Sequence, residues 1–393
     1  MRLEPVQIAP LMIQSQAEIE PIQKPCYVKD MAVKSKSSAS AKLDASIKLK
    51  DVAKAAGVSQ GTASNVFSKP DVVREEVREH VLAVAKELGY AGPSVTGRLL
   101  RQGKVNAVGV AAIQPLSYFF EDPWARQLMS HISAICDARG AGVALVSALN
   151  DERLAWNIQS ALVDGFVLLC VEGGDALVEI TRQRQLPYVA LAIAASDASI
   201  PTIGVDNVSG ARLAAEHLIG LGHRRLAILS TMMSHDGGGR MTEAQLEAAT
   251  FSTSRDRVLG YWLAMDAAGI PRTSAPVFET REDEASTHEA MAEMFAASEP
   301  PTAILAMSDK IALYGADWLV RHGIAIPDDV SIVGFDGVPE GAIARPSLTT
   351  MEQPMAEIAR LAVDAALGVT HVEGQQMLQT RLLVRDSTAP PRA

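Results

Sequence analysis

Residues 48–73 read KLKDVAKAAGVSQGTASNVFSKPDVV, a stretch in which two very short helical segments surround a single glycine, Gly57. The first segment has apolar residues on one face, and Gly57 permits a tight turn at its end. In the second segment Ala63 and Val66 are three residues apart, so they share the face that packs against the first. The opposite face of the second segment carries only small polar groups. A core helix has no use for such a face, whereas a helix that enters a narrow polar groove does.

The outer face of the second segment has the chemistry of a nucleic-acid contact. Ser59 is suited to cap this helix, because its hydroxyl accepts a hydrogen bond from a backbone N–H. Short side chains with donors and acceptors can reach base edges or phosphates in a major groove. We therefore predict a DNA-reading helix; the alternative is a helical hairpin without a ligand. The outward groups are Gln60, Gly61, Thr62 and Asn65.

Charge is distributed unevenly along the chain. Residues 41–105 hold 11 Lys and Arg and 7 Asp and Glu, a net charge of +4. Residues 106–393 carry a net charge of −15. A small basic module in an otherwise acidic protein favours a polyanionic partner for that module alone.

Length and composition exclude several classes of protein. A chain of 393 residues with 48% hydrophobic residues is typical of two or three globular units. No apolar run approaches the roughly 18 residues of a membrane helix, and the N-terminus does not resemble a signal peptide. We predict a cytoplasmic protein without membrane contact. The three cysteines, Cys26, Cys136 and Cys170, are too scattered for a disulfide framework and fit a reducing compartment.

Downstream of the helical module the pattern changes to strands alternating with helices. Apolar runs such as VNAVGVAAI, GFVLLCV, RLAILS and SIVGFDG are typical of buried parallel strands, and amphipathic segments separate them. About 290 residues of this pattern exceed one ordinary core, so we predict two α/β lobes with helices on both faces of parallel sheets. Ligands of such sheets bind beyond the carboxyl ends of the strands, which places the expected site in a cleft between the lobes.

Residues 47–90, from IKLKDVAKAAGVSQGTASNVF to VAKELGY, resemble the DNA-binding headpiece of the lactose-repressor (LacI-type) family of bacterial transcription regulators. The resemblance continues through residues 47–388, in register with the family's ligand-binding core. It implies that Gln60, Gly61 and Asn65 read bases. It also implies that Ser59, Thr62 and Ser64 hold phosphates.

The segment PSVTGRLLRQG, residues 93–103, is similar to the hinge of that family. The resemblance implies a short helix that forms only when two copies meet in the minor groove, since so short a helix is unstable alone. Leu100 lies at the position of a wedge that kinks DNA, and Arg98 and Arg101 supply charge for the DNA backbone. The alternative is a plain interdomain linker.

The core also resembles ribose-type periplasmic sugar-binding proteins, which close two lobes around a small polar ligand. Arg257 in RDRVLGY and Asp336 in VGFDG match an effector-binding arginine and its acidic partner. An arginine, carboxylates and aromatic rings together suit a sugar. The resemblance implies an effector site made of Tyr118, Phe120, Asp122, Arg257, Ser308, Asp309 and Asp336.

Each of these polar residues also has a structural alternative. Asp309 can cap the helix that follows it, and Asp336 can accept hydrogen bonds from turn amides. Arg257 can form a surface ion pair with Asp256 or Asp266. Ser308 stands where many relatives have asparagine, so a nucleobase, a nucleoside or another small metabolite stays open as the effector.

No catalytic constellation is visible in the sequence. It contains no HExxH or GxSxG motif and no Cys/His pairing at metal spacing. We predict a non-enzymatic regulator without cofactor or metal, binding double-stranded operator DNA as a homodimer under the control of an effector. The alternatives are a solute-binding protein with the same core, a regulator that responds to a nucleobase or nucleoside corepressor, and an α/β enzyme.

The predicted domain organisation follows from these segments. Residues 1–46 form a disordered extension, and 47–92 the headpiece. Residues 93–103 form the hinge, 104–388 the two-lobed effector and dimerisation domain, and 389–393 a tail. Within the core, residues 232–254 are long for a strand-to-helix connection, and we expect a flexible flap over the cleft.

Two helix starts depart from the family pattern. Lys48 and Arg74 stand where relatives usually have Thr and Ser caps, and Val77 replaces a usual Thr. Loss of a cap typically costs about 1 kcal/mol. We expect a headpiece of less than average stability.

The identity of Asn65 generates a prediction about the operator. Many relatives carry Arg at this position, whereas an Asn side chain pairs bidentately with adenine, a contact worth roughly 1–3 kcal/mol of discrimination. We expect an A·T pair at the half-site position that Asn65 contacts. Selection of random duplexes followed by sequencing measures this preference, and a fixed G·C pair there would refute it.

Overall fold

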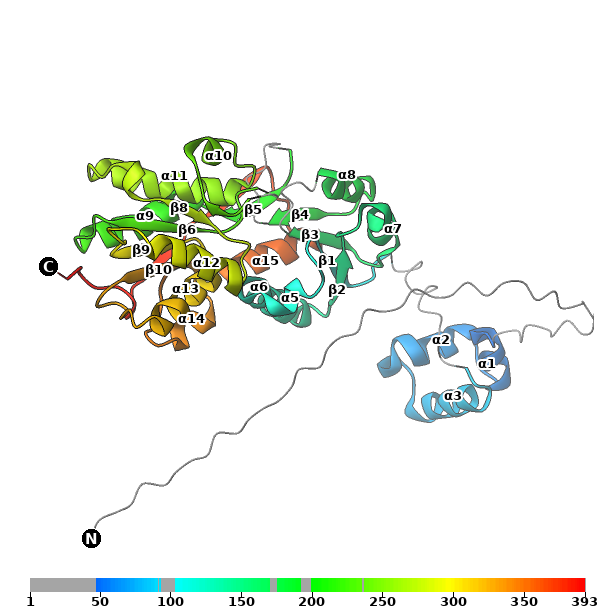
Figure 1. The fold of residues 1–393 in the computed structure, drawn as a ribbon. Helices are drawn as coiled ribbons and strands as arrows, with labels where there is room; N and C mark the ends of the chain where they lie inside the picture. The colour runs from blue at the N-terminus through cyan, green and yellow to red at the C-terminus, as the bar shows by residue number, and fades with distance from the viewer. Residues whose placement is uncertain are drawn as a thin grey trace, which may run out of the picture. The chain divides into compact units, whose positions relative to one another are not determined.

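The computed structural model describes residues 47–90, 92, 103–169, 175–191, 199–234 and 237–392 (Figure 1). The chain forms two compact units, Met1–Pro93 and Ser94–Ala393. The predicted hinge contacts of Arg98, Leu100 and Arg101 lie outside the described residues, as does the predicted extension 1–46.

The first unit is a bundle of short helices. Val52, Ala63 and Val81 are fully buried at its centre, and Gly57 has a φ of 64°, as the tight turn between the first two helices requires. The rings of Phe67 and Tyr90 meet edge to face at 5.6 Å and close one end of the bundle. The elements are α1 (Leu49–Ala55), α2 (Gln60–Ser68), the 3-10 turn η1 (Pro70–Val72) and α3 (Glu75–Glu87).

In the second unit, the first lobe is built on a parallel sheet with strand order β12-β5-β4-β3-β1-β2. Helices α6 and α15 pack against each other on one face, and α7 and α8 on the other. Its strands are β1 (Ala107–Ala112), β2 (Gly142–Ser147), β3 (Gly165–Leu169), β4 (Tyr188–Leu191), β5 (Thr202–Val205) and β12 (Gln375–Leu378). Its helices are α5 (Tyr118–Glu121), α6 (Pro123–Ala138), α7 (Asp151–Ser160), α8 (Asp175–Gln183) and α15 (Met355–Ala366).

The second lobe repeats this plan with strand order β13-β11-β10-β9-β6-β8-β7, in which only the edge strands β13 and β7 pair antiparallel. The strands are β6 (Leu226–Ser230), β7 (Gly239–Arg240), β8 (Val277–Glu279), β9 (Ala303–Ala306), β10 (Ser331–Asp336), β11 (Thr349–Glu352) and β13 (Arg381–Leu383). The helices are α9 (Asn207–Gly220), α10 (Glu243–Glu247), α11 (Ser252–Ala267), η2 (Arg272–Ser274), α12 (Glu284–Phe295), α13 (Asp309–Arg321) and α14 (Pro339–Ile343).

The two lobes are linked by crossings of the chain. It leaves the first sheet after β5 to form α9, returns after β11 to form α15, and crosses again between β12 and β13. The predicted two-lobed α/β core is confirmed. Carboxyl ends of strands from both sheets therefore face the space between the lobes, where parallel sheets bind ligands.

Helices α9 and α11 lie side by side on the second lobe (Figure 1) and touch at Gly260. A Cβ atom at Gly260 would lie 2.3 Å from the carbonyl oxygen of Val208 and 2.8 Å from the Cβ of Ala211. Both neighbours belong to α9, and a backbone oxygen cannot rotate away. The glycine is therefore required by close helix packing.

The headpiece helices begin in different ways. Ser59 caps α2 by accepting from the N–H of Thr62 at 3.0 Å. At α1, the carboxylate of Asp51 accepts from the N–H of Lys48 at 2.9 Å, which offsets the missing Thr cap. Arg74 makes no side-chain cap at the start of α3. Neither Lys48 nor Arg74 caps its helix with a side chain, but at α1 Asp51 supplies the other half of a capping box.

We predict that Gly260→Ala destabilises the second unit by about 1–3 kcal/mol, because the added methyl forces α11 away from α9. The matched control is Gly220→Ala in α9, where a Cβ atom would meet nothing within 4 Å. That control should be neutral or stabilising by up to about 1 kcal/mol, since alanine is the better helix former. Urea unfolding of the full chain measures both variants, and equal stabilities would contradict the packing argument.

We predict that Arg74→Ser stabilises α3 by about 0.5–2 kcal/mol, because the serine hydroxyl accepts from a first-turn N–H. Lys48→Thr should gain less, since Asp51 already serves the N–H of Lys48. Hydrogen–deuterium exchange of residues 75–87 in the full chain measures the effect as slower exchange in the Arg74→Ser protein. Unchanged exchange would show that the N-cap position does not limit this helix.

Candidate functional site

The predicted DNA-reading residues share the exposed side of α2. Gln60, Gly61 and Asn65 are exposed, and Thr62 and Ser64 are half-buried. Ala63 and Val66 are buried on the opposite side, so the face that remains is small and polar. The hydroxyls of Ser59 and Thr62 lie 2.9 Å apart and fix each other's position at the helix start. This face can present donors and acceptors to a groove without a bulky side chain in the way.

A cavity of about 700 Å³ opens between the two lobes of the second unit. This volume falls in the range of small-molecule sites in proteins. Its walls come from the ends of β1, β4 and β5 in the first lobe and from the loops after β6, β8, β9 and β10 in the second. Of the seven residues predicted to hold an effector, five line it: Tyr118, Asp122, Arg257, Ser308 and Asp336.

Arg257 is the central polar group of this cavity. Its side chain is buried, with 6% of its surface exposed, in the first half of α11. The Nε atom donates to Asn207 Oδ1 at 2.9 Å, and an Nη atom donates to the carbonyl oxygen of Met307. The guanidinium lies over the ring of Phe335, 3.7 Å from its centre. Burial lowers the pKa of Arg257, and the charge of Asp336 opposes that change. The side chain is thereby held in one orientation at the cavity wall.

Asp336, at the end of β10, faces the same cavity. Its Oδ1 atom accepts a hydrogen bond from Gln353 Nε2 at 2.8 Å. Burial raises the pKa of Asp336 well above its ordinary value, and the positive charge of Arg257 counteracts this rise. Gln353 also accepts from the indole N–H of Trp124 at 3.3 Å, so the contact extends from Asp336 to the first lobe.

Two of the four described non-glycine residues with a positive φ line this cavity. Asp336 has a φ of 130° and Glu282 a φ of 61°, both in the region that favours glycine, and both residues line the cavity. Such conformations cost about 1–3 kcal/mol each and persist where the surroundings enforce them. Two strained acidic residues at one cavity are a physical sign of a functional site.

Ser308 and Asp309 separate at the start of α13. Ser308 lines the cavity and caps the helix by accepting from the N–H of Ile311 at 3.3 Å. Asp309 is fully buried and lies outside the cavity lining. Its Oδ2 atom accepts from the N–H groups of Gly337 and Val338, each at 2.8 Å, and Oδ1 accepts from Thr350 at 2.5 Å. The geometry therefore gives Asp309 a structural role in fixing the turn after β10.

The first lobe contributes the loop between β1 and α6. Asp122 caps α6 by accepting from the N–H groups of Trp124 and Ala125, each at 3.1 Å. Its second oxygen lies 3.3 Å from the ammonium of Lys310, which belongs to the other lobe. Phe120, in contrast, is 66% exposed and is not part of the cavity wall. The short helix α5 turns this ring toward the surface.

The predicted surface ion pairs of Arg257 do not form. Asp256 pairs with Arg255 at 3.2 Å, and Asp266 pairs with Arg272 at 2.5 Å. Side chains at adjacent helix positions point about 100° apart. Arg257 is therefore on the buried side of α11, whereas Asp256 points to one edge of that side. Burial excludes the surface alternative for Arg257.

The cavity residues that sequence reasoning missed include Asn207, Arg281, Glu282 and Gln353. Asn207 lies two residues after β5, and Gln353 follows directly on β11. At both points the chain passes from one lobe to the other, and this position could have identified the two residues. Arg281 and Glu282 lie in TREDEAS, which has the pattern of a solvated charged turn. Only the backbone conformation of Glu282 distinguishes it from such a turn.

The connection 232–254 makes several backbone hydrogen bonds where it is described. Glu279 accepts from the N–H groups of Met233 and Ser234 at 2.5 and 3.2 Å, and β7 pairs with β8. The N–H groups of Thr250 and Phe251 both donate to the carbonyl oxygen of Met233. Met232, Phe251, Thr253 and Ser254 line the cavity. The described part of this segment thus forms part of the cavity wall, and its movement as a flexible flap stays a prediction.

Among the described residues, no helix is both long and apolar enough to cross a membrane.

The side chains of Glu284, His288 and Asp317, which could together hold a metal ion, cluster on the surface of α12 and α13. Both carboxylates of this cluster already pair with Arg321.

Comparisons with known proteins match parts of both units. Residues 48–92 match the model of bacterial regulatory proteins of the lacI family, and residues 215–388 match a periplasmic binding protein-like domain. The HTH-type transcriptional regulator Rv3575c of Mycobacterium tuberculosis is 37% identical over 86% of this chain and 95% of its own length.

Two solved structures extend the similarity over both units. A complex of the transcriptional regulator CelR with cellobiose is 27% identical with a TM-score of 0.62, covering 87% of this chain and 99% of its own. The lac repressor dimer bound to operator and the anti-inducer ONPF is 25% identical with a TM-score of 0.68, over the same shares of the two chains. Members of this family are transcriptional regulators and not enzymes. The chain therefore belongs to the lacI family of bacterial transcriptional regulators.

Proposed function

We propose that the protein is a repressor that binds a pseudo-palindromic operator as a homodimer and is controlled by a sugar or related metabolite in the interlobe cavity. The observation that carries this proposal is that buried Arg257 and buried Asp336, which interact through their charges, both line a cavity walled by both lobes. A guanidinium and a carboxylate bond hydroxyl groups, and Tyr118 and Trp124 offer apolar ring faces in the same cavity. The relative CelR, solved with cellobiose, supports a sugar.

Effector control follows from the contacts that join the lobes. Lys310 pairs with Asp122, Arg126 pairs with Glu340, and Trp124 donates to Gln353 across the cleft. A ligand that bonds to groups on both walls favours one degree of closure over another. In a dimer, a change of closure alters the spacing of two headpieces and so the affinity for DNA.

An apolar surface on the first lobe supports dimerisation. Trp156 of α7 is 71% exposed, and Leu149 and Leu162, which flank the same helix, are also exposed. The neighbouring strand β2 is an edge of its sheet. Exposed apolar patches of this kind typically mark protein interfaces, and a second copy of the chain is the partner that two-fold operators require. A protein with this function acts in the cytoplasm, on the nucleoid.

The experiment that tests the proposal is selection of random duplex DNA by the purified full-length protein. A palindrome should be enriched, and its half-site spacing should fit a dimer. Sugars, polyols and nucleobases are then screened for an effect on the thermal midpoint and on operator affinity. A nucleobase as the sole effector would support the corepressor alternative, and no effect of DNA or ligand would contradict the regulator assignment.

We predict that Arg257→Met abolishes the effector response and keeps operator affinity within about threefold of the wild type. Loss of two charge-assisted hydrogen bonds, each worth about 1.5–3 kcal/mol, weakens effector binding by roughly 100-fold or more. The matched control is Arg255→Met, two residues away on the same helix, where the side chain is half-exposed and pairs with Asp256. Fluorescence anisotropy of labelled operator, titrated with effector, measures both. An Arg257→Met protein with a wild-type response would refute the assignment of Arg257.

A further inference from the structure

The loop after β8 presents one carboxylate to the cavity in an enforced conformation. Glu282 has a φ of 61°, which residues with a Cβ atom rarely adopt. Its neighbours Arg281 and Asp283 have no such conformation, and both turn toward α12. The backbone therefore reverses at Glu282 and separates its carboxylate from the ion pairs of Arg281 with Asp283 and Glu289, although Arg281 also lines the cavity.

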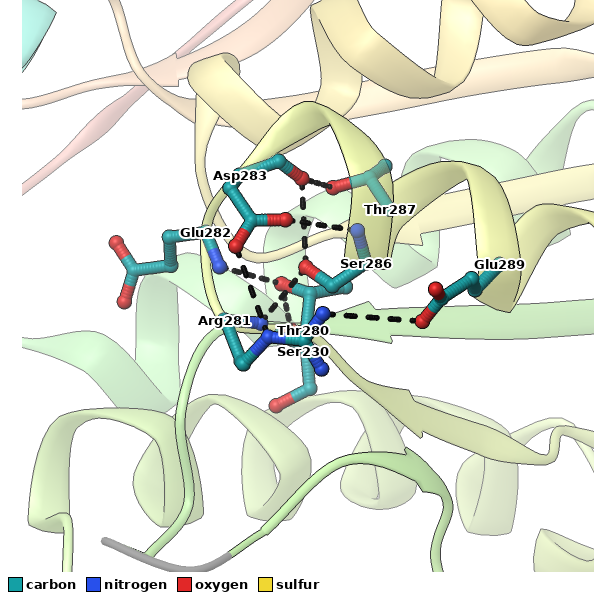
Figure 2. Close-up of polar contacts among 8 residues, drawn as sticks. All are labelled: Ser230, Thr280, Arg281, Glu282, Asp283, Ser286, Thr287 and Glu289. Atoms are coloured by element: carbon teal, nitrogen blue, oxygen red, sulfur yellow. Dashed lines mark hydrogen bonds and ion pairs between the residues drawn. The ribbon is translucent and has the colours of Figure 1, made fainter. Parts of the chain in front are cut away.

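A network of hydrogen bonds holds this conformation in place (Figure 2). The N–H of Glu282 donates to Thr280 Oγ1 at 3.2 Å, and the same hydroxyl donates to the carbonyl oxygen of Ser230 at 2.9 Å. On the other side, Asp283 Oδ1 accepts from the N–H of Ser286 at 2.7 Å and caps α12. Figure 2 shows the carboxylate of Glu282 pointing away from this network. The surrounding residues thus fix the backbone and leave the carboxylate outside their own hydrogen bonds.

The carboxylate of Glu282 faces the cavity and charges from both lobes. A backbone hydrogen bond from Met232 and the charges of Lys310 and Arg257 lower its pKa, but burial and the nearby carboxylate of Asp122 outweigh them and raise it. Glu282 is part of the cavity wall. It therefore lies where a bound ligand replaces water around the carboxylate.

The other carboxylates of the wall already have strong partners. Among the described residues, no Lys, Arg or His nitrogen lies within 4.0 Å of the carboxylate of Glu282. Arg281, the adjacent cation, instead lies 3.6 Å from Asp283 and 3.8 Å from Glu289. The partnered carboxylates are Asp122 with Lys310, Asp256 with Arg255, Asp206 with the N–H of Ser209, and Asp336 with Gln353. Unlike Asp122 and Asp256, Glu282 has no cation paired with it in the described part of the chain and accepts only the N–H of Met232, so its carboxylate, like that of Asp336, can meet a ligand.

We propose that Glu282 is a specificity-determining residue that selects an unphosphorylated, polyhydroxylated effector and excludes the phosphate ester of the same molecule. A carboxylate accepts hydrogen bonds from ligand hydroxyls, whereas a phosphate near it is a like charge in a water-poor site. Specificity in such a site comes from the repulsive contact as much as from the attractive one. This inference rests on the proposed function, since it concerns the effector of the same cavity.

The competing explanation is that Glu282 only holds the N–H of Met232. Glu282→Gln distinguishes the two, because glutamine keeps the size and an acceptor oxygen and removes the negative charge. Glu279→Gln is the matched control. Glu279 holds the neighbouring N–H groups of Met233 and Ser234 but is not part of the cavity wall. A purely structural effect on this loop should appear in both variants.

The experiment measures ligand affinity by calorimetry at pH 7.5 for the wild type and both variants. The probes are matched pairs: cellobiose and cellobiose 6′-phosphate, glucose and glucose 6-phosphate, ribose and ribose 5-phosphate, and myo-inositol and its 1-phosphate. For the pair that binds, the wild type should prefer the neutral member by about 100-fold or more, given the cost of like charges in contact. Glu282→Gln should reduce that preference at least tenfold, and Glu279→Gln should leave it unchanged.

Three results would overturn the inference. The first is that the wild type binds a phosphate ester more tightly than its neutral partner. The second is that Glu282→Gln keeps the wild-type preference. The third is that no neutral probe binds the wild type. Selection of operator DNA in parallel separates these results from failure of the proposed function. An enriched palindrome together with any of the three contradicts only the assignment of Glu282.

Discussion

The burial of the Arg257 guanidinium is the constraint on which the second lobe depends. A buried cation is tolerated only where its donors have acceptors and its charge has a partner. The acceptors come from the start of α9 and from the residue after β9, and the charge partner is Asp336 at the end of β10. Three segments distant in sequence must therefore converge on one side chain. Helix α11 reaches this position because Gly260 lets it approach α9 closely.

The same constraint connects the cavity to the first lobe. Gln353 lies between an acceptor, the Asp336 carboxylate, and a donor, the indole N–H of Trp124. The Gln353 amide therefore has one orientation that satisfies both partners, with the NH2 group donating to the carboxylate and the oxygen accepting from the indole. Hydrogen bonds thus run from Asp336 through Gln353 to Trp124 at the start of α6, and the charge of Arg257 acts on the Asp336 end of this chain. A ligand that bonds to Asp336 competes for the same oxygens, so its binding is coupled to the contact between the lobes.

Much of this arrangement is visible in the sequence, because buried parallel strands are continuous apolar runs and turn glycines mark their ends. RLAILS and SIVGFDG are strands β6 and β10, and VAKAAG ends a helix where Gly57 requires it. Ser308, and not Asp309 as the structural alternative had it, caps α13. The actual role of Asp309 could not be predicted, because its hydroxyl partner Thr350 is 41 residues away and its amide partners depend on the turn after β10.

Other residues were unpredictable for local reasons. Phe120 is apolar and lies in the expected loop, yet the four-residue helix α5 turns it outward while Phe119 takes the buried position. The exposed turn TREDEAS gives no sign that one of its carboxylates faces a cavity, because a positive φ at a glutamate has no sequence signature.

The division of charge along the chain gives a physical reason for the dimer that we propose. Residues 41–105 carry a net charge of only +4, and the rest of the chain is acidic and repels DNA. Phosphate contacts provide most of the non-specific affinity, so one such headpiece binds weakly at physiological salt. Two headpieces joined through their ligand domains act at a high effective concentration on a two-fold site. That gain depends on the geometry of the link, and a ligand that changes lobe closure by differential contacts can therefore change operator affinity without touching the DNA.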